Sequence, residues 1–286
     1  MRFLLSGSLS ALCFVAALLF WQPRSVPLEP IILADGDFVY HLHQPDATFG
    51  LDHDLDEISG LAFVDENTLA AVNDEQGHIF LYDLSTGRII DEIDFGKGGD
   101  YEGIAVRGTT AYVLRSDGDV YEVANYRGDL RTEKYENPLR GANDAEGLSY
   151  DEATQQLLIA CKASGRAEHP SASDEALVYG FSPNRPDELS PILSLDPRDV
   201  RPSGIARHPS STHYYVLSSA DKQLVIFGSD RQPRQRIKLP RSLFPQPEGI
   251  CFAPDGILYV ANEAKRDRAA SGRATILQFN PRIDSP

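Results

Sequence analysis

A short core that is repeated five times, and the β-rich runs that follow each copy, predict an all-β fold: a five-bladed β-propeller of four-stranded blades, preceded by an N-terminal hydrophobic helix. Each core consists of Ser or Glu, then Gly, then Leu or Ile, then a small residue, and its glycine recurs at intervals of 43 to 57 residues. The five copies are Ser59-Gly60-Leu61-Ala62, Glu102-Gly103-Ile104-Ala105, Glu146-Gly147-Leu148-Ser149, Ser203-Gly204-Ile205-Ala206 and Glu248-Gly249-Ile250-Cys251.

Each core opens the first strand of a blade, and runs rich in β-branched and aromatic residues supply the other strands. Second strands are expected at 68–72, 110–114, 156–160, 213–217 and 257–261, third strands at 78–84, 119–123, 176–181, 223–227 and 275–279, and fourth strands at 88–95, 131–135, 191–195 and 235–239. Outside the N-terminal segment the apolar residues show no helical period. Four-stranded repeats of this length are typical of propeller blades.

The fifth repeat ends without a fourth strand, while an unassigned β-rich run at residues 38–43 precedes the first repeat. We expect this run to pair with residues 275–279 and close the ring, because closure removes an open sheet edge. The expected organisation is a signal or membrane anchor at 1–24, a linker at 25–36, the propeller at 37–282 and a tail at 283–286.

The N-terminal segment has the features of an export signal. Residues 3–21 carry no charge and are flanked by Arg2 and Arg24. Nineteen uncharged, mostly apolar residues can just span a bilayer core of about 30 Å. No small-x-small cleavage site follows them, which favours an uncleaved anchor over a removed signal. The excess positive charge before the segment places the main body on the periplasmic, extracytoplasmic side of the inner membrane.

Composition narrows the classes of partner. The chain has 42 Asp and Glu against 27 Lys and Arg, a formal net charge of −15. Nucleic acid is therefore disfavoured as a partner, because neutralising phosphates needs clustered basic residues. Cations or basic surfaces fit better. Cys161 and Cys251 lie in short apolar runs and are expected to be buried free thiols, although a disulfide remains possible in an oxidising compartment.

The repeat register gathers acidic residues at one mouth of the channel. The first and second strands of a blade run antiparallel, so the start of one and the end of the other lie on the same face. Carboxylates gathered there favour a hard cation that accepts oxygen ligands, and calcium is the expected ion. An alternative interpretation is that the repeated Glu only fixes blade turns through backbone amides. The candidate metal ligands are Glu102, Glu146, Glu248, Asp100, Asp144 and Glu57.

The repeat motifs resemble those of the SdiA-regulated, YjiK-like family, and several blades resemble NHL repeats and phytase-like propellers. The resemblance covers about residues 38–281 and rests on segments such as Asp100-Tyr101-Glu102-Gly103-Ile104 and Asn143-Asp144-Ala145-Glu146-Gly147. It implies an exported or membrane-attached five-bladed propeller with a calcium site and no established enzymatic activity. Ser59 and Ser203 depart from Glu at the repeat position, which argues against a symmetric ring of five carboxylates.

These observations lead us to expect a non-enzymatic calcium-binding propeller that presents a face to an envelope protein or small-molecule ligand. The alternative is a metal-dependent hydrolase, either a phytase-like phosphomonoesterase or a gluconolactonase-like lactonase. A purely structural interaction ring is the third possibility. A phosphatase should add several basic residues to the mouth, and besides the arginines near the C-terminus only Arg115 and Lys162 are expected there. The chain has no nucleophile elbow, phosphate loop or His-Glu-x-x-His motif, so no catalytic residue is assigned.

Overall fold

The computed structural model describes residues 32–35, 38–139, 144–162, 176–194, 200–267 and 270–283. Within these ranges the regular secondary structure is β-strand except for one short 3-10 helix, η1 (His53–Leu55). Accordingly, the described chain contains no helix long and apolar enough to cross a membrane. The hydrophobic segment 1–24 expected to form an anchor lies outside the described residues.

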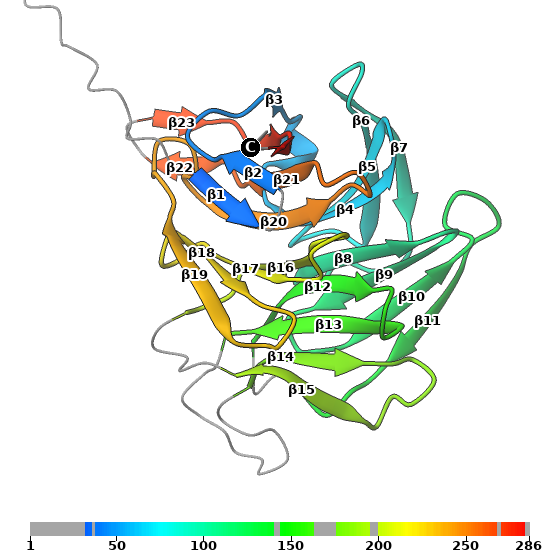
Figure 1. Ribbon diagram of the computed structural model, residues 1–286. Helices are drawn as coiled ribbons and strands as arrows, with labels where there is room; N and C mark the ends of the chain where they lie inside the picture. The colour runs from blue at the N-terminus through cyan, green and yellow to red at the C-terminus, as the bar shows by residue number, and fades with distance from the viewer. Residues whose placement is uncertain are drawn as a thin grey trace, which may run out of the picture.

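Five antiparallel four-stranded sheets are arranged around one axis, which confirms the predicted five-bladed propeller (Figure 1). The first strand of each blade lies next to the axis and the fourth lies outermost. The first four blades are β4 (Ile58–Asp65), β5 (Thr68–Asn73), β6 (His78–Asp83) and β7 (Arg88–Asp94); β8 (Tyr101–Arg107), β9 (Thr110–Arg115), β10 (Val120–Ala124) and β11 (Arg131–Tyr135); β12 (Ala145–Asp151), β13 (Gln156–Cys161), β14 (Ala176–Phe181) and β15 (Leu189–Ser194); and β16 (Gly204–Arg207), β17 (Tyr214–Ser218), β18 (Gln223–Phe227) and β19 (Pro233–Lys238).

Blade five combines both ends of the domain, but the predicted closing strand was wrong. It consists of β20 (Pro247–Phe252), β21 (Leu258–Asn262), β24 (Thr275–Phe279) and β3 (Ala47–Gly50). The closing partner of β24 is therefore β3, with Gly50 opposite Thr275 and Ala47 opposite Gln278. A short hairpin of β22 (Lys265–Asp267) and β23 (Ala270–Gly272) lies between β21 and β24 in the chain.

Burial explains why residues 38–43 do not close the ring. An outermost strand needs only one half-buried face, and β3 alternates between half-buried and exposed residues. In β2 (Phe38–His41), by contrast, Val39 and Tyr40 are both buried. This strand joins β1 (Ile32–Asp35) and β25 (Arg282–Ile283) in a separate three-stranded sheet. There Tyr40 packs against His208 and Phe252 of the fourth and fifth blades.

The repeated glycines are required by a close approach of the five innermost strands. A Cβ placed on Gly60 would lie 2.8 Å from the Cα of Gly103, and one on Gly147 would lie 2.8 Å from the Cα of Gly204. Real Cβ atoms essentially never come within 3.0 Å of another heavy atom in this way. The remaining contacts complete the ring, because a Cβ on Gly103, Gly204 or Gly249 would meet Leu148, Glu248 or Leu61 respectively.

The two positions after each glycine pack neighbouring blades together. The Leu or Ile of one blade shares a buried apolar cluster with the small residue of the preceding blade. Full burial of a Leu or Ile side chain contributes roughly 1.5–3 kcal/mol. The pairs are Ala62 with Ile104, Ala105 with Leu148, Ala206 with Ile250, and Cys251 with Leu61. Cys161 and Cys251 are free and buried, as expected.

Candidate functional site: the carboxyl-rich mouth of the channel

The repeat-position residues lie immediately on one side of the glycine ring. Glu102, Glu146 and Glu248 are the second residues of β8, β12 and β20, and each directly precedes a ring glycine. Glu102 and Glu248 line the narrow space on the axis together with Ser59 and Ser203. That space is about 10 Å³, roughly enough for one water molecule. We call the surface around it the acidic mouth, and it also includes Glu57, Asp74, Asp100, Asp144 and Glu263.

Lys162, which follows β13, is the basic partner of Glu146. Its Nζ lies 2.6 Å from Glu146 Oε1, and the Glu146 side chain is 6% exposed. Burial raises the pKa of Glu146 to about 7, although the charge of Lys162 acts in the opposite direction. Burial by itself would lower the pKa of Lys162. The charge of Glu146 and its hydrogen bond with the lysine act in the opposite direction, and the lysine pKa is raised. Lys162 therefore serves as a counterion within the protein. The charges of Glu248 and Asp144 also raise its pKa.

Glu102 is paired with another acid instead of a base. Burial, the charge of Glu146 and a hydrogen bond with Asp100 together raise the pKa of Glu102 to about 10. At neutral pH Glu102 therefore carries a proton, which it can donate to the exposed carboxylate of Asp100.

Glu248 has serine and lysine neighbours. Burial raises its pKa, while hydrogen bonds with Ser219 and Ser203 and the charges of Lys162 and Lys222 act in the opposite direction. On this side of the mouth, carboxyl groups are thus offset by ammonium groups.

A second acid pair lies at the junction of the first and fifth blades. Burial, a hydrogen bond with Glu57 and the charge of Glu248 raise the pKa of Glu263 to about 8. Gln246 Nε2 also donates a hydrogen bond to the Glu263 carboxylate. Burial and the charges of Glu57, Glu75 and Asp100 raise the pKa of Asp74 to about 6. Glu57 and Asp100 are therefore members of one group of mutually repelling carboxyls.

The six predicted ligands divide into two subsets. Asp144, Glu146 and Glu248 surround Lys162. Glu57, Asp100 and Glu102 instead have other acids as their main neighbours, and the charge of Lys162 has only a smaller, opposing effect on the pKa of Glu102. The structure adds Asp74, Glu263 and Lys222 to the mouth, and none of the three is among the predicted ligands. The position of Asp74 and Glu263 at the ends of second strands was the available signal.

The serines at the repeat position connect neighbouring blades through backbone carbonyls, a role different from the turn fixing through backbone amides considered for Glu. Ser59 Oγ donates a 2.6 Å hydrogen bond to the carbonyl oxygen of Tyr101 in the next blade. Ser203 Oγ donates a 2.8 Å bond to the carbonyl oxygen of Pro247, again in the next blade. The glutamates, by contrast, have the side-chain partners described above.

The donor chemistry suits a hard cation, because carboxylate oxygens are the ligands that calcium prefers. The side-chain positions do not yet form such a site. Among the residues that the structure describes, no three His, Cys, Asp or Glu side chains are grouped closely enough to hold a metal ion. A bound calcium ion would require several carboxyls to turn toward it.

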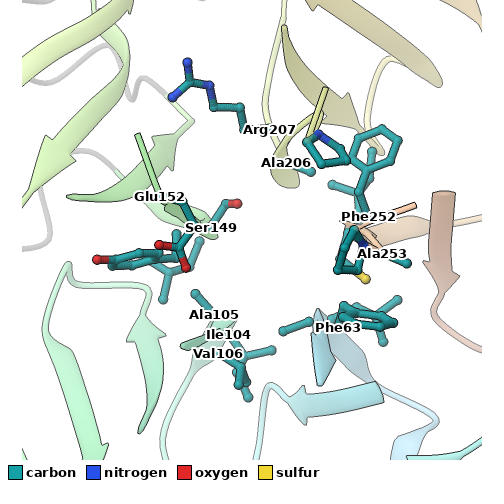
Figure 2. Close-up of a pocket in the computed structure, with 18 residues that line it drawn as sticks. Phe63, Ile104, Ala105, Val106, Ser149, Glu152, Ala206, Arg207, Phe252 and Ala253 are labelled. Carbon is teal, nitrogen blue, oxygen red and sulfur yellow. The ribbon is translucent and has the colours of Figure 1, made fainter. Parts of the chain in front are cut away.

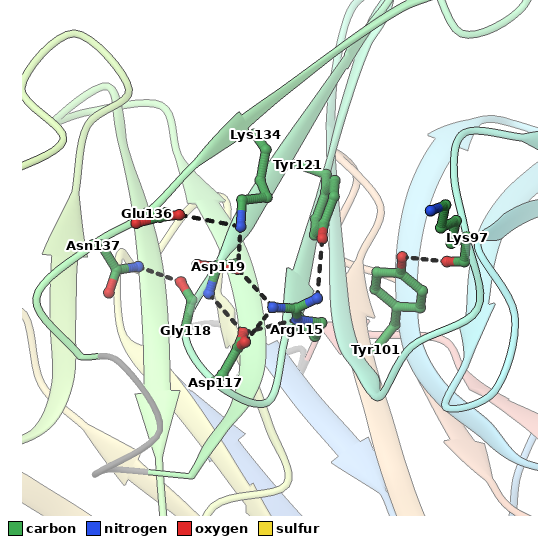
Figure 3. A network of polar contacts seen from close by, with 10 residues as sticks. All are labelled: Lys97, Tyr101, Arg115, Asp117, Gly118, Asp119, Tyr121, Lys134, Glu136 and Asn137. Carbon is green, nitrogen blue, oxygen red and sulfur yellow. Dashed lines mark hydrogen bonds and ion pairs between the residues drawn. The ribbon is translucent and has the colours of Figure 1, made fainter.

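A charged network next to the mouth engages the other expected basic residue, Arg115 (Figure 3). Its guanidinium pairs with Asp117 and lies 2.7 Å from Asp119, and it donates a hydrogen bond to the Tyr121 hydroxyl at 3.2 Å. Lys134 lies 2.8 Å from the same Asp119 carboxylate. Arg115 and Lys162 are thus both engaged with carboxylates of this chain.

Fold and site together define a five-bladed propeller with a carboxyl-rich axial mouth. The chain belongs to the SdiA-regulated family, whose model matches residues 40–266. No curated protein matches the chain.

Among solved structures, the fold is similar to that of glutaminyl cyclase from Myxococcus xanthus, at 12% identity and a TM-score of 0.57, covering 85% of this chain and 97% of the other. It is also similar to the PQQ-bound aldose sugar dehydrogenase from Streptomyces coelicolor, at 13% identity and a TM-score of 0.57, covering 84% and 98%. At these identities the similarity concerns the fold alone.

Proposed function

We propose that the protein is a non-enzymatic propeller that binds a divalent cation, calcium, at the acidic mouth and presents this face to a protein or small molecule of the cell envelope. The observation that carries the proposal is the presence of two hydrogen-bonded acid pairs, Glu102 with Asp100 and Glu263 with Glu57, at one mouth. Two adjacent carboxyls share a proton or repel each other, and a divalent cation that replaces the proton relieves the repulsion.

The two halves of the mouth differ in what they offer a cation. Lys162 already neutralises Glu146, so a metal there would compete with an ammonium group at 2.6 Å. Glu57, Asp100 and Glu102, with Asp74 beside them, supply carboxyl oxygens whose close neighbours are further acids. We therefore assign the cation to the half of the mouth formed by the first and second blades.

A hydrolase is less well supported. Recognition of a phosphate needs basic side chains that can turn toward it. Arg115 and Lys162 are held by Asp117, Asp119 and Glu146. A panel of phosphomonoester and lactone substrates, assayed with calcium, tests this alternative. Turnover of any of these substrates would show that the protein is a hydrolase and not only a binding protein.

The proposal places the propeller at the outer face of the inner membrane, attached through the hydrophobic segment 1–24. Fractionation of cells followed by N-terminal sequencing of the protein tests this placement. A mature chain that starts beyond Trp21 would show that the segment is removed.

The cation site is tested by thermal unfolding of the full chain in detergent with increasing calcium chloride. A ligand at a hundredfold excess over its Kd stabilises the folded state by about 2.7 kcal/mol, so the Tm should rise with calcium. A Glu57→Gln, Glu102→Gln double variant should lose that rise. Glu66→Gln removes an exposed carboxylate from a turn in blade one and should keep it. A wild-type Tm that does not respond to calcium contradicts the proposal.

A further inference from the structure

The opposite end of the propeller axis carries a pocket of about 300 Å³ (Figure 2). It begins where the first strands leave the glycine ring, and Leu61, Ile104, Leu148 and Ile250 line both the pocket and the narrow axial space. Because that space holds about 10 Å³, the pocket is closed toward the acidic mouth. A volume of about 300 Å³ is at the lower end of the range for small-molecule sites.

Small residues of the repeat create the pocket. The fourth position of all five cores lines it, and in three blades that position is Ala. Larger side chains follow at the next position and form the rim, where Figure 2 shows Phe63 and Phe252 on the side opposite Ser149 and Glu152. The five lining residues at the fourth position are Ala62, Ala105, Ser149, Ala206 and Cys251.

In two of the five blades the fourth position is not Ala: it is Ser149 in the third blade and Cys251 in the fifth. Cys251 is 8% exposed and packs in the apolar cluster with Leu61, so its thiol belongs to the wall. Ser149 is only half-buried, and its hydroxyl is directed toward the centre of the pocket (Figure 2). The pocket therefore offers a hydroxyl group at one point of an otherwise mainly apolar inner wall.

Neither charged side chain at the rim is a strong partner for a charged ligand. Arg207 pairs with Asp151 and donates a hydrogen bond to the Thr212 carbonyl oxygen, and Figure 2 shows its side chain directed away from the centre. Glu152 is 74% exposed and lies 4.0 Å from Arg107. Among the described residues that line the pocket, no other carries a charged side chain. An anion would lose hydration without gaining a free cation, and the largely exposed Glu152 would stabilise a cation only weakly, so the complementary ligand is uncharged.

We propose that this pocket binds a small, uncharged, mainly apolar molecule that forms one hydrogen bond with Ser149. The site lies at the opposite end of the axis from the acidic mouth and does not depend on cation binding there. The apolar walls contribute affinity through burial, and the Ser149 hydroxyl, which is directed toward the centre of the pocket, orients the ligand.

The test uses the uncharged fluorophore N-phenyl-1-naphthylamine, whose one N–H can donate to Ser149 Oγ, with the full chain in detergent micelles and the signal of protein-free micelles subtracted. We expect a saturable rise in fluorescence at one molecule per chain. The anionic analogue 8-anilinonaphthalene-1-sulfonate, which has the same rings, should bind at least tenfold more weakly. Equal or tighter binding of the sulfonate, or no saturable binding of the neutral probe, overturns the proposal.

Substitutions that narrow the pocket show whether the probe binds there. Val106 is half-buried at the rim, and Val106→Trp should weaken binding of the neutral probe at least tenfold. Ile90→Trp adds the same side chain at an outer-strand position that is 56% exposed, and it should leave binding unchanged. Pro209→Trp, at an exposed rim position, provides a second block if Val106→Trp does not fold. Ser149→Ala should weaken binding several-fold, and wild-type affinity in that variant would contradict the assigned hydrogen bond.

A second copy of the chain is the competing occupant. Sedimentation of the wild type and of Val106→Trp distinguishes the two, because a wild-type dimer that dissociates in the variant would mean that the pocket receives a protein side chain. A monomer in both cases, with probe binding lost only in the variant, supports the small-molecule site.

Discussion

Lys162 Nζ lies 2.6 Å from Glu146 Oε1 inside the ring of acids, so one glutamate of the repeat has a permanent cationic partner in the protein itself. The other two repeat glutamates form their hydrogen bonds with an acid or with serines: Glu102 with Asp100, and Glu248 with Ser203 and Ser219. This asymmetry decides which part of the mouth can respond to an added cation.

Replacing Lys162 with Met should destabilise the protein by about 1–3 kcal/mol at pH 8, because the buried carboxylate of Glu146 loses its partner. At pH 5 the loss should be smaller, since Glu146 is then protonated in both variants. Urea unfolding at the two pH values measures the difference. Lys97→Met, at an exposed position, is the control and should change little. An equal loss at pH 5 and pH 8 would show that the charge of Glu146 is not involved.

Without added cation, the unfolding free energy should fall as pH rises from 7 to 9. The pKa of Glu263 is raised to about 8 and that of Glu102 to about 10, whereas both groups ionise near 4.5 when unfolded. The folded chain therefore binds more protons than the unfolded chain in this window, and raising the pH favours unfolding.

Thermal unfolding across this pH range checks the prediction, and Glu102→Gln should flatten the slope while Glu66→Gln should not. Calcium should increase the Tm most at pH 9, because Glu263 is then largely deprotonated and Glu102 partly so, and calcium no longer has to displace those protons. A Tm that increases from pH 7 to pH 9 would be the contrary result.

Tyr40→Phe should destabilise the protein by about 1–3 kcal/mol. The Tyr40 hydroxyl donates a 2.7 Å hydrogen bond to the Gly256 carbonyl oxygen and lies 2.9 Å from His208 Nε2. Tyr82→Phe is a matched control, because the buried Tyr82 hydroxyl has no hydrogen-bond partner within the described chain. Urea unfolding should show a clear loss for the first variant and little or none for the second. Equal losses would contradict a role for the Tyr40 hydrogen bonds.

Acid should weaken the same contact. His208 Nδ1 accepts hydrogen bonds from the amides of Ser210 and Ser211, which fixes the ring in its neutral form. Burial lowers the pKa of His208, so the stability it contributes is present above pH 6.5 and is lost as pH falls below that value. Asp35 and His213 also face this histidine, and their charges act in opposite directions on its pKa. The protection of residues 38–41 against hydrogen exchange, taken relative to the intrinsic exchange rate at each pH, should fall between pH 7 and pH 5, and unchanged protection over that range would oppose the interpretation.

Gly103→Ala should destabilise the ring by about 1–3 kcal/mol, because its Cβ would lie 2.7 Å from the backbone nitrogen of Leu148. Gly50→Ala, at a position where a Cβ meets nothing within 4 Å, should be tolerated. Thermal unfolding of both variants and of the wild type measures the difference in Tm. If Gly103→Ala melts with the wild type, the close approach of the innermost strands is not what requires glycine.

The spacing of the repeat, by itself, determined that this chain forms five blades of four strands, because each glycine marks the one point where an innermost strand meets its neighbour. The sequence also placed the acids at one mouth, since antiparallel strands bring the start of the first strand and the end of the second to the same face. The first inference depends on the spacing between repeats and the second on the order of strands within one repeat, and both can be read directly from the sequence.

Only the tertiary structure decided which strand closes the ring and which side chains pair. Residues 38–41 and 47–50 are both able to form strands, and the choice depends on the burial of Tyr40 against His208, about 170 residues away. Lys162 reaches Glu146 because β13 ends beside the start of β12. The pocket at the other end exists because small residues from five distant cores meet on one axis. The repeat shows that these residues are small, but only the assembled ring shows that they enclose a space.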